Sequence, residues 1–368
     1  MKVLIVSKIL VVAAYRRKLE AIAALPEVDQ LTAVTGPEWR EPDGRQVRFE
    51  PTAASRAYDL RVEPLWLNGS YHLFLWPRLG RIVREVNPDL VHIDEEPYNL
   101  ATAHCTWLAQ RFGARSLFFT WQNLLRSYPP PFSWFERAVF ARSAFGIAGS
   151  HEALQVIRTK GYCGPGAVIP QFGIDPRLFT PATNPASGAP VIGFVARLVE
   201  EKGLLVLLEA LRGLQGDWRL HVIGSGPLEP TARRRAETIG LGHRVTWERG
   251  VESTRMPERL RSFTVLVQPS LTRPNWKEQF GRAVMEAMAC GVPVIGSDSG
   301  EISQVVGDAG LVVREGNSHA LRDAIARTLA DEGLRHQLAE RGRQRVLQCY
   351  THSRIAEQTL AAYRAAMV

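Results

Sequence analysis

The stretch from Ser270 to Gly300 reads SLTRPNWKEQFGRAVMEAMACGVPVIGSDSG and says more about the fold than any other part of the chain. The apolar residues 265–269 before it predict a buried strand, and residues 293–296 predict a second one. Between these strands lie a loop with Glu278 and a helix with Glu286. Open α/β sheets bind ligands at the carboxyl ends of their strands, and a helix N-terminus favours anions. The stretch therefore predicts an anion site at the edge of a parallel sheet.

Short β-rich runs alternate with helical stretches along the chain, which predicts parallel sheets covered by helices on both faces. The strands expected in the first half are residues 3–7, 30–34, 90–93, 116–119, 146–148 and 168–169. The helices expected there are residues 15–25, 78–86, 100–112, 134–141 and 150–160. The strands expected in the second half are residues 191–195, 219–223, 244–247, 265–268, 292–295 and 311–313.

One segment has the composition of a linker between two domains. Residues 180–190, TPATNPASGAP, are rich in proline, serine and glycine and have no apolar period. We therefore expect a first Rossmann-like domain over residues 1–182 and a second over residues 190–350. A last helix, at about residues 351–366, is expected to pack back on the first domain.

Composition and charge narrow the class of protein. The chain has 368 residues, of which 45% are apolar, and four cysteines that lie far apart in the sequence. With no secretory or membrane-spanning stretch in the sequence, this favours a cytoplasmic protein with reduced thiols. The net charge of +8 is spread over both halves, and no nucleic-acid-binding signature accompanies it. An anionic small ligand, an anionic membrane surface, or both, explain the excess of positive charge better than nucleic acid does.

A second anion-binding motif lies at the start of the second half. Residues 193–203, GFVARLVEEKG, place Arg197 and Lys202 between a strand and a helix. Two cations beside a helix N-terminus suit a diphosphate. The alternative is a solvated loop with an ordinary surface ion pair.

A third motif, Gly224-Ser225-Gly226, follows the strand expected at residues 219–223. It resembles part of a dinucleotide fingerprint, with Glu248 at about the right distance for an acid that binds ribose. Glu229 stands where a third glycine is needed, so the fingerprint is incomplete. An NAD-dependent oxidoreductase and a plain tight turn both remain open.

The spacing of Glu278 and Glu286 bears on their chemistry. With much of the interval helical, their backbones lie on the order of 10–12 Å apart, whereas glycosidase carboxylates flank one bond at roughly 5–9.5 Å. Two carboxylates that hold different hydroxyl groups of one long ligand fit this spacing better. Glu286 also lies in an almost wholly apolar helix, where a carboxylate needs a partner.

Together these residues resemble the retaining nucleotide-sugar glycosyltransferases of family 4, of the type that builds bacterial cell-surface glycans, polysaccharides and glycolipids. The resemblance implies the GT-B fold, in which two doubly wound Rossmann-like parallel-sheet domains face each other across a cleft. It is strong over residues 191–313, moderate over residues 88–179, and faint before them.

The resemblance assigns roles to the motif residues of the second half. Glu278 and Glu286 match the family's E-x7-E motif, in which the first would hold donor-sugar hydroxyls and the second the ribose. Arg197 and Lys202 match the pair that binds the diphosphate and stabilises the departing phosphate, so Arg197, Lys202 and Glu278 are the expected catalytic residues. The further expected donor contacts are Gly224, Gly226, Val251 at the nucleobase, and Gln279, Phe280 and Gly281.

The first half departs from the family pattern. The glycine pair usual after the first strand is absent, and Tyr15 and Arg16 follow instead. Gln122 and Asn123 stand near the position of a family histidine, and Glu95 and Glu96 end another strand. These six residues are the expected contacts to the acceptor or the transferred sugar.

The resemblance implies transfer of a sugar from a UDP- or GDP-sugar to a hydroxyl of a glycan, glycolipid or small-molecule acceptor. The acceptor would attack the face from which the phosphate leaves, and no metal or cofactor would be needed. The open alternatives are a sugar-nucleotide epimerase of the same fold, the oxidoreductase above, and a nucleotide-sugar-binding module without catalysis.

Aromatic residues mix with cations in three segments of the first half, residues 65–67, 71–78 and 128–137. Such belts occur at membrane interfaces, and peripheral binding to the inner face of the plasma membrane would suit a lipid-linked acceptor. Packing within the core or a lid is the ordinary alternative.

Overall fold

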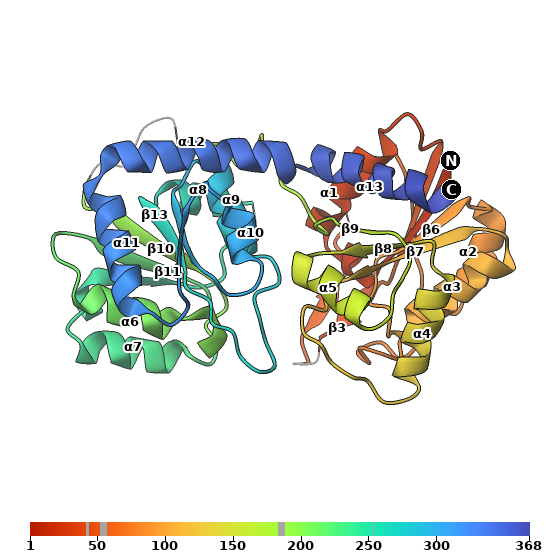
Figure 1. The fold of residues 1–368 in the computed structure, drawn as a ribbon, viewed down its shortest axis with the longest axis horizontal. Coiled ribbons are helices and arrows are strands. Elements are labelled where there is room, and N and C mark those ends of the chain that lie inside the picture. The colour runs from red at the N-terminus through yellow and green to blue at the C-terminus, as the bar shows by residue number, and fades with distance from the viewer. Residues whose placement is uncertain (42–43, 52–56, 183–187, 253) are drawn as a thin grey trace. The chain divides into compact units, whose positions relative to one another are not determined.

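The structure is a computed structural model that describes residues 1–41, 44–51, 57–182, 188–252 and 254–368 (Figure 1). It divides into two compact units. Unit 1 comprises Met1–Gly173 and His352–Val368, and unit 2 comprises Ile174–Thr351. Each unit contains a parallel sheet with helices on both faces, so the predicted pair of Rossmann-like α/β domains is confirmed.

In the described part of unit 1, seven parallel strands form one sheet in the order β5-β2-β1-β6-β7-β8-β9. Their bounds are β1 Lys2–Val6, β2 Gln30–Thr35, β5 Asp59–Val62, β6 Leu90–Ile93, β7 Arg115–Thr120, β8 Phe145–Ala148 and β9 Gly166–Val168. The edge strand β5 was not predicted, nor was the small antiparallel pair of β3 (Glu38–Arg40) and β4 (Gln46–Arg48). These short, half-exposed strands lack the apolar runs that mark buried ones.

The alternation of side chains along β1 explains why unit 1 is covered on both faces. Val3 and Ile5 lie in one hydrophobic cluster with α1 and α13, and Leu4 and Val6 lie in another with α2 and α3. Successive strand residues point to opposite faces, so a strand that is apolar throughout needs a helix layer on each side. The helices of unit 1 are α1 Ala13–Ala23, α2 Leu79–Val86, α3 Leu100–Arg111, α4 Phe132–Arg142, α5 His151–Thr159 and α13 His352–Met367.

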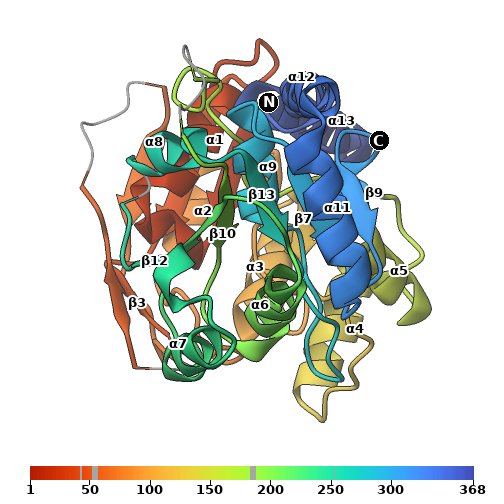
Figure 2. The ribbon, with the colours of Figure 1, turned by 90° about the vertical axis from the view of Figure 1, so that its left-hand side faces the viewer.

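Unit 2 has the same design. Its six parallel strands take the order β12-β11-β10-β13-β14-β15 among the described residues, with α6 and α11 on one face and α8 and α9 on the other (Figure 2). The strands are β10 Val191–Val195, β11 Arg219–Ile223, β12 Val245–Glu248, β13 Val265–Gln268, β14 Val294–Ser297 and β15 Leu311–Val313. The helices are α6 Leu204–Arg212, α7 Glu229–Thr238, α8 Met256–Arg261, α9 Arg282–Ala289, α10 Ile302–Val306, α11 Ser318–Ala330 and α12 Glu332–Cys349.

The first boundary between the units lies earlier than the linker composition indicated. Ile174 belongs to unit 2, where its N–H donates to the carbonyl of Tyr350 at 2.9 Å. Farther along, Arg343 on α12 donates to the carbonyls of Pro176, at 3.0 Å, and Phe179. The segment from residue 174 to the linker is therefore bound to unit 2 and not to unit 1. Residues 183–187, the middle of the expected linker, lie outside the described residues.

The chain returns to unit 1 at its C-terminal end. Helix α13 packs on α1 and contacts β7 and β8. On its buried face the Tyr363 hydroxyl lies 2.8 Å from Nδ1 of His92 on β6, and burial lowers the pKa of His92 to about 3. A neutral histidine and a tyrosine thus join this helix to the centre of the sheet.

Candidate functional site

The principal candidate site lies in unit 2, where the strand order reverses. Strand β10 has β11 on one side and β13 on the other, so the connections that leave β10 and β13 diverge and open a crevice at their carboxyl ends. A cavity of about 440 Å³ occupies this place. Its lining residues are Val195, Ala196, Arg197, Lys202, Val251, Met256, Gln268, Glu278, Gly281, Arg282, Ala283 and Glu286.

A chain of hydrogen bonds fixes Glu278 at the floor of the cavity. Lys202 Nζ donates to Glu278 Oε2 at 2.6 Å, and Ser270 Oγ donates to the same oxygen at 2.9 Å. The Gln268 amide donates to Ser270 Oγ at 3.0 Å. Because Gln268 ends β13 and Lys202 precedes α6, the structure joins the two predicted anion motifs directly.

Gly203 explains how the loop after β10 brings Lys202 to this place. Its φ is +74°, in the left-handed region that glycine adopts readily. A Cβ atom there would lie 1.8 Å from the carbonyl oxygen of Pro269. The loop can approach the end of β13 this closely only with glycine at position 203, which sets the backbone next to Lys202.

Glu286 projects into the cavity from the second turn of α9. Its side chain is 9% exposed and accepts a hydrogen bond from Arg282 Nε at 2.7 Å, one turn earlier on the helix. Burial raises the pKa of Glu286, while the Arg282 guanidinium acts in the opposite direction. The partner that the apolar helix required is thus Arg282, a residue that the sequence analysis did not single out.

The residues between the two glutamates have different surroundings. Gly281 lines the cavity and precedes α9 as its N-cap, with a φ of +81°. The Phe280 ring is buried and packs edge-on against Tyr350, 5.6 Å away between centroids, whereas Gln279 is exposed. The Phe280 ring therefore supports the loop, which leaves only its backbone for the predicted donor contact.

Arg197 and Val251 also line the cavity. Arg197 is exposed and, within the described ranges, has no ion-pair partner. Lys202, in contrast, is already paired with Glu278. The two predicted diphosphate ligands therefore differ: one cation is held in place and the other can adjust to a ligand.

Gly224 and Gly226 lie beside the cavity and do not line it. A Cβ atom on Gly224 would lie 1.9 Å from the carbonyl oxygen of Ala196, and one on Gly226 would lie 2.3 Å from that of Leu198. Their small size is thus needed for packing against the loop that carries Arg197. Their predicted contact with the donor stays a prediction.

The structure gives no support to the dinucleotide fingerprint. Glu248, the acid expected to bind ribose in that case, accepts two hydrogen bonds from Arg259 Nε, at 2.9 and 3.0 Å. Glu229, at the position of the missing glycine, accepts hydrogen bonds from Arg233 and Arg249. Both acids are engaged by arginines of unit 2, and the glycines have a packing role.

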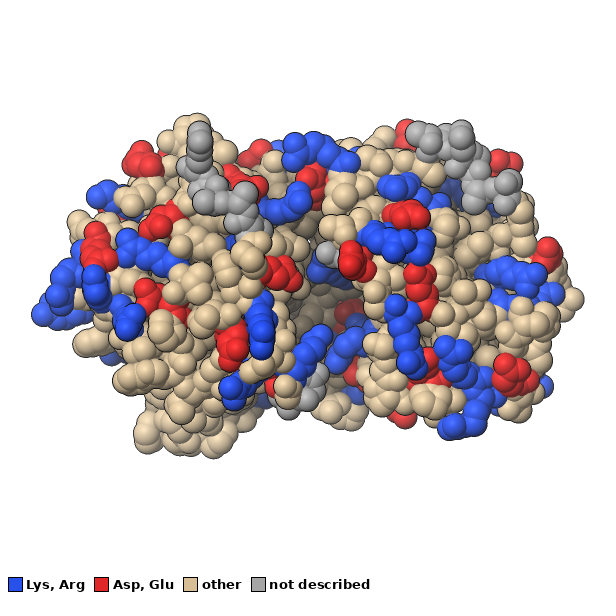
Figure 3. All heavy atoms as spheres, turned by 180° about the vertical axis from the view of Figure 1, so that it is seen from behind, with Lys and Arg blue, Asp and Glu red and all other residues tan. Residues whose placement is uncertain are grey.

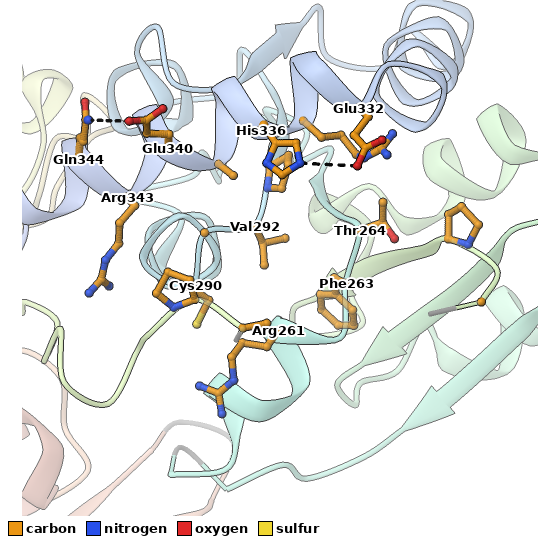
Figure 4. Close-up of a pocket in the computed structure, with 18 residues that line it drawn as sticks. Arg261, Phe263, Thr264, Cys290, Val292, Glu332, His336, Glu340, Arg343 and Gln344 are labelled. Atoms are coloured by element: carbon orange, nitrogen blue, oxygen red, sulfur yellow. Dashed lines mark hydrogen bonds and ion pairs between the residues drawn. The ribbon is translucent and has the colours of Figure 1, made fainter. Parts of the chain in front are cut away.

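A larger cavity of about 660 Å³ lies elsewhere in unit 2, beneath α12 (Figure 4). Thr264 and Pro293, which precede β13 and β14, line it, so it lies at the opposite end of the strands from the candidate site. Its Arg343 is engaged by three main-chain carbonyls, and Arg261 donates to the carbonyl of Thr180. The two arginines thus serve the main chain around this cavity.

In unit 1 the polar side chains gather at the carboxyl ends of β1, β6 and β7, which are neighbours in the sheet. Glu95 is buried and forms an ion pair with Lys8, whose backbone N–H also donates to the carboxylate at 2.8 Å. The ammonium lies 4.9 Å from the centre of the Phe74 ring and 5.3 Å from that of Trp39. The negative charge of Glu95 is thus balanced by the Lys8 ammonium within unit 1.

Glu96 is held differently from its neighbour. One carboxylate oxygen accepts from Thr120 Oγ1 at 2.6 Å, and the other accepts from the N–H of Trp121 at 2.8 Å. Burial raises the pKa of Glu96 to about 7. Glu96 has no ion-pair partner within the described residues, so its carboxyl group is poised between its two protonation states near neutral pH.

Gln122 and Asn123 are both buried. The side-chain oxygen of Gln122 accepts from Lys160 Nζ at 3.3 Å, and Lys160 is also paired with the buried Glu136 on α4. Burial raises the pKa of Glu136, and Lys160 opposes that shift. The side chain of Gln122 therefore has a place in a polar cluster of unit 1 that the sequence did not reveal.

Tyr15 stacks on Phe172 with ring centroids 5.9 Å apart. The Arg16 side chain is buried and donates to the carbonyls of Leu10, at 2.7 Å, Val11 and Glu50. The guanidinium thus fastens the loop that follows β1, a role that sequence cannot show. The predicted contact of Arg16 with the acceptor stays a prediction.

The aromatic segments of unit 1 divide into buried and exposed residues. Phe74 and Trp76 are fully buried in the core. These two residues of the segment 71–78 therefore pack within the core, as the alternative to a membrane interface expected. Trp66 and Leu67 are 62% and 59% exposed, and Trp134 is 58% exposed. Charged side chains of both signs lie side by side over the face shown in Figure 3. In the described ranges no helix is long and apolar enough to cross a membrane.

Comparisons with known proteins bear on the fold and on the class of protein. The family model described as "Glycosyl transferases group 1" matches residues 178–345, nearly all of unit 2. A GDP-mannose-dependent alpha-(1-6)-phosphatidylinositol monomannoside mannosyltransferase of Mycolicibacterium smegmatis is 32% identical over 54% of this chain and 52% of its own length. An alpha-maltose-1-phosphate synthase of the same organism is 30% identical over 63% of this chain and 66% of its own length. The chain thus spans less than two thirds of each of these relatives.

Solved structures resemble the chain over nearly its whole length. Anabaena Alr3699/HepE in complex with UDP has a TM-score of 0.76 at 17% identity and covers 99% of this chain and 100% of its own. Sucrose-phosphate synthase from Thermosynechococcus elongatus has a TM-score of 0.74 at 20% identity, over 99% of this chain and 98% of its own. At these identities the likeness shows the fold, which is GT-B. The match to the family model is confined to residues 178–345, within unit 2.

Proposed function

We propose that this protein is a retaining glycosyltransferase that uses a nucleoside-diphosphate sugar, with UDP or GDP as its nucleotide. The observation that carries the proposal is the cavity at the reversal of strand order in unit 2, where three cations and two buried carboxylates lie together. The named relatives support the same activity, because one is a GDP-mannose-dependent mannosyltransferase and a structural neighbour binds UDP.

The donor would place its charged and its hydroxylated parts on different side chains of this cavity. Arg197 and Lys202 bind the diphosphate, and the N-terminus of α9 at Gly281 adds the positive end of its dipole. Glu278 accepts hydroxyl hydrogens of the sugar, and Glu286 those of the ribose. Val251 borders the nucleobase. In this arrangement the cations meet the phosphates of the nucleotide sugar, and the carboxylates accept hydrogen bonds from its hydroxyl groups.

The chemistry separates the sugar from the nucleotide as negative charge grows on the β-phosphate. Lys202 is held before the reaction by Glu278, so little reorganisation is needed when this charge develops. The acceptor hydroxyl attacks the face that the phosphate leaves, and a phosphate oxygen takes its proton. No protein nucleophile, metal ion or other cofactor is required in this scheme.

The acceptor is a glycan, a glycolipid or a small molecule with a free hydroxyl, and it binds at the polar edge of unit 1. Glu96 is the best candidate contact, because it is only partly buried and has no ion-pair partner among the described residues. Its carboxyl group can accept a hydrogen bond from an acceptor hydroxyl. Tyr15, in the first turn of α1, offers an aromatic surface.

Incubation with UDP- and GDP-sugars, followed by detection of the released nucleotide and of the anomer formed, tests the proposal. Lys202→Ala is expected to abolish most donor turnover, whereas Arg212→Ala, on the exposed face of α6, serves as the matched control and is expected to keep it. Turnover that persists in Lys202→Ala contradicts the assignment. An epimerase would instead change the sugar without an acceptor, and a binding module would release no nucleotide.

Peripheral attachment to an anionic membrane is a second proposal, favoured by the exposure of Trp66, Leu67 and Trp134. Tryptophan at such positions suits the interface between water and lipid. Flotation with anionic vesicles at low salt should carry the protein upward, and Trp66→Ser with Leu67→Ser should reduce this. Absence of co-flotation removes the membrane from the account and leaves the transferase proposal intact.

A further inference from the structure

Trp276 lies in the loop between β13 and α9, beside the cation of the donor site. Lys202 Nζ is 4.7 Å from the centre of the Trp276 ring. The same ammonium donates to Glu278 at 2.6 Å, so it is held between a carboxylate and an aromatic face. Neither the E-x7-E spacing nor the diphosphate motif includes this tryptophan.

The backbone of Trp276 is itself fixed. Residues Arg273 and Trp276 form a tight antiparallel bridge in which each N–H donates to the other's carbonyl, at 2.8 and 3.1 Å. The turn between them is exposed, while the Trp276 side chain is partly buried. The ring is therefore presented to Lys202 by a closed loop rather than by a free one.

An aromatic face and a carboxylate hold an ammonium in different ways. Lysine has a flexible four-carbon stem and loses rotamer freedom when it is fixed. The carboxylate of Glu278 attracts the ammonium, but it also competes with the phosphate for it and repels the phosphate. The Trp276 ring attracts the cation through its quadrupole and carries no net charge, so it can hold Lys202 while a diphosphate binds.

We infer that Trp276 is a positioning residue, which keeps the Lys202 ammonium at the place where the donor's diphosphate binds. The inference rests on the proposed function, because it assumes that the cavity takes a nucleoside diphosphate. It predicts an effect confined to the β-phosphate. Loss of the Trp276 ring should weaken the binding of nucleoside diphosphates and leave the binding of nucleoside monophosphates unchanged.

Binding is measured by calorimetry after a thermal-shift panel of UDP, GDP, ADP and TDP has identified the preferred base. For Trp276→Leu we expect affinity for that diphosphate to fall by about two- to thirtyfold, the range that cation–π contacts span. Affinity for the monophosphate of the same base should not change. Trp276→Phe, which keeps an aromatic face, should restore most of the loss.

The matched control is Trp247→Leu, because Arg233 lies over the Trp247 ring at the same 4.7 Å and Trp247 does not line the cavity. It should bind both nucleotides as the unmodified protein does. In a Lys202→Ala background, Trp276→Leu should have no further effect on diphosphate affinity. This comparison remains decisive even if the tryptophan variant is less stable.

The outcomes separate the inference from the proposed function. If the unmodified protein binds no nucleoside diphosphate of the panel, the proposed function fails and the inference with it. If it binds one and Trp276→Leu binds it equally well, only the inference is overturned. The inference is also overturned if monophosphate affinity falls as much as diphosphate affinity, or if the effect persists in the Lys202→Ala background.

Discussion

The pair of Lys202 and Glu278 allows a prediction that separates stability from catalysis. Their side chains are only 14% and 9% exposed, and the atoms Nζ and Oε2 are 2.6 Å apart. Lys202→Ala removes a hydrogen bond between charged groups, of about 1.5–3 kcal/mol, and leaves Glu278 with Ser270 as its remaining partner within this hydrogen-bond chain. Fixing a lysine side chain costs rotamer entropy on folding, and alanine has no such cost. This offsets part of the loss, so we expect a net decrease of about 2 kcal/mol in the free energy of unfolding.

The same substitution should cost much less when Glu278 is already neutral. In a Glu278→Gln background no carboxylate is left without its cation, so Lys202→Ala should cost under about 1 kcal/mol. The coupling energy of the double-mutant cycle is then about 1–2 kcal/mol, which is within the range for residues in contact. Urea unfolding monitored on unit 2, with its three tryptophans Trp218, Trp247 and Trp276 as probes of the transition, gives the four free energies of unfolding.

Catalysis should not follow this pattern. Lys202→Ala is expected to lower donor turnover by about 100-fold or more in either background, the size of effect seen when one preorganised donor to a developing charge is removed. Equal unfolding costs in the two backgrounds would refute the coupling derived from the structure. Recovery of turnover along with stability in the double variant would refute the separate catalytic role of Lys202.

Three further predictions follow from the two units. Glu286→Gln should weaken donor binding at least tenfold without loss of stability, because it relieves a carboxylate whose pKa burial raises; calorimetry and urea unfolding measure the two effects, and unchanged affinity would contradict the role. Glu96 has its pKa raised from 4.5 to about 7, so the native state binds more protons than the unfolded one between these pH values, and its contribution to stability is lost as pH rises from about 4.5 to 7. Glu96→Gln should remove that loss, as seen in unfolding free energies at pH 5 and 7.5, and an identical pH dependence in both proteins would count against it. Gly203→Ala should destabilise unit 2 by several kcal/mol, since its Cβ would lie 1.8 Å from the carbonyl oxygen of Pro269 at a φ of +74°; Gly216→Ala, with a φ of +93° and no atom within 4 Å of the added Cβ, is the control for backbone strain alone.

The sequence predicts the fold well where apolar strands are continuous. Strands β10 and β13 were expected at the residues where they lie, because a strand buried on both faces is apolar throughout. The edge strand β5 and the pair of β3 and β4 are short and half-exposed, so they carry no comparable signal. The first boundary between the units was misplaced because Arg343, far along the chain, binds the segment before the linker.

The residues of the candidate site likewise divide into those that local sequence indicates and those that only the structure reveals. Arg197, Lys202, Glu278 and Glu286 could be found from local spacing, and the structure brings them to one cavity. Arg282 and Trp276 could not, because their significance lies in what they contact. In unit 1 sequence spacing does not distinguish Glu95, which is paired with Lys8, from Glu96, which has no ion-pair partner in the part of the chain that the structure describes.

Donor turnover in the presence and absence of the Lys202 ammonium tests the central claim most directly. The protein and its Lys202→Ala variant are incubated with UDP- and GDP-sugars and a panel of hydroxyl acceptors, and the released nucleoside diphosphate and the anomer of the product are measured. The account predicts release from one donor, a product with the anomeric configuration of that donor, and near-complete loss in the variant. Release that is absent from the unmodified protein with every donor, equal in the variant, or accompanied by inversion at the anomeric carbon would contradict it.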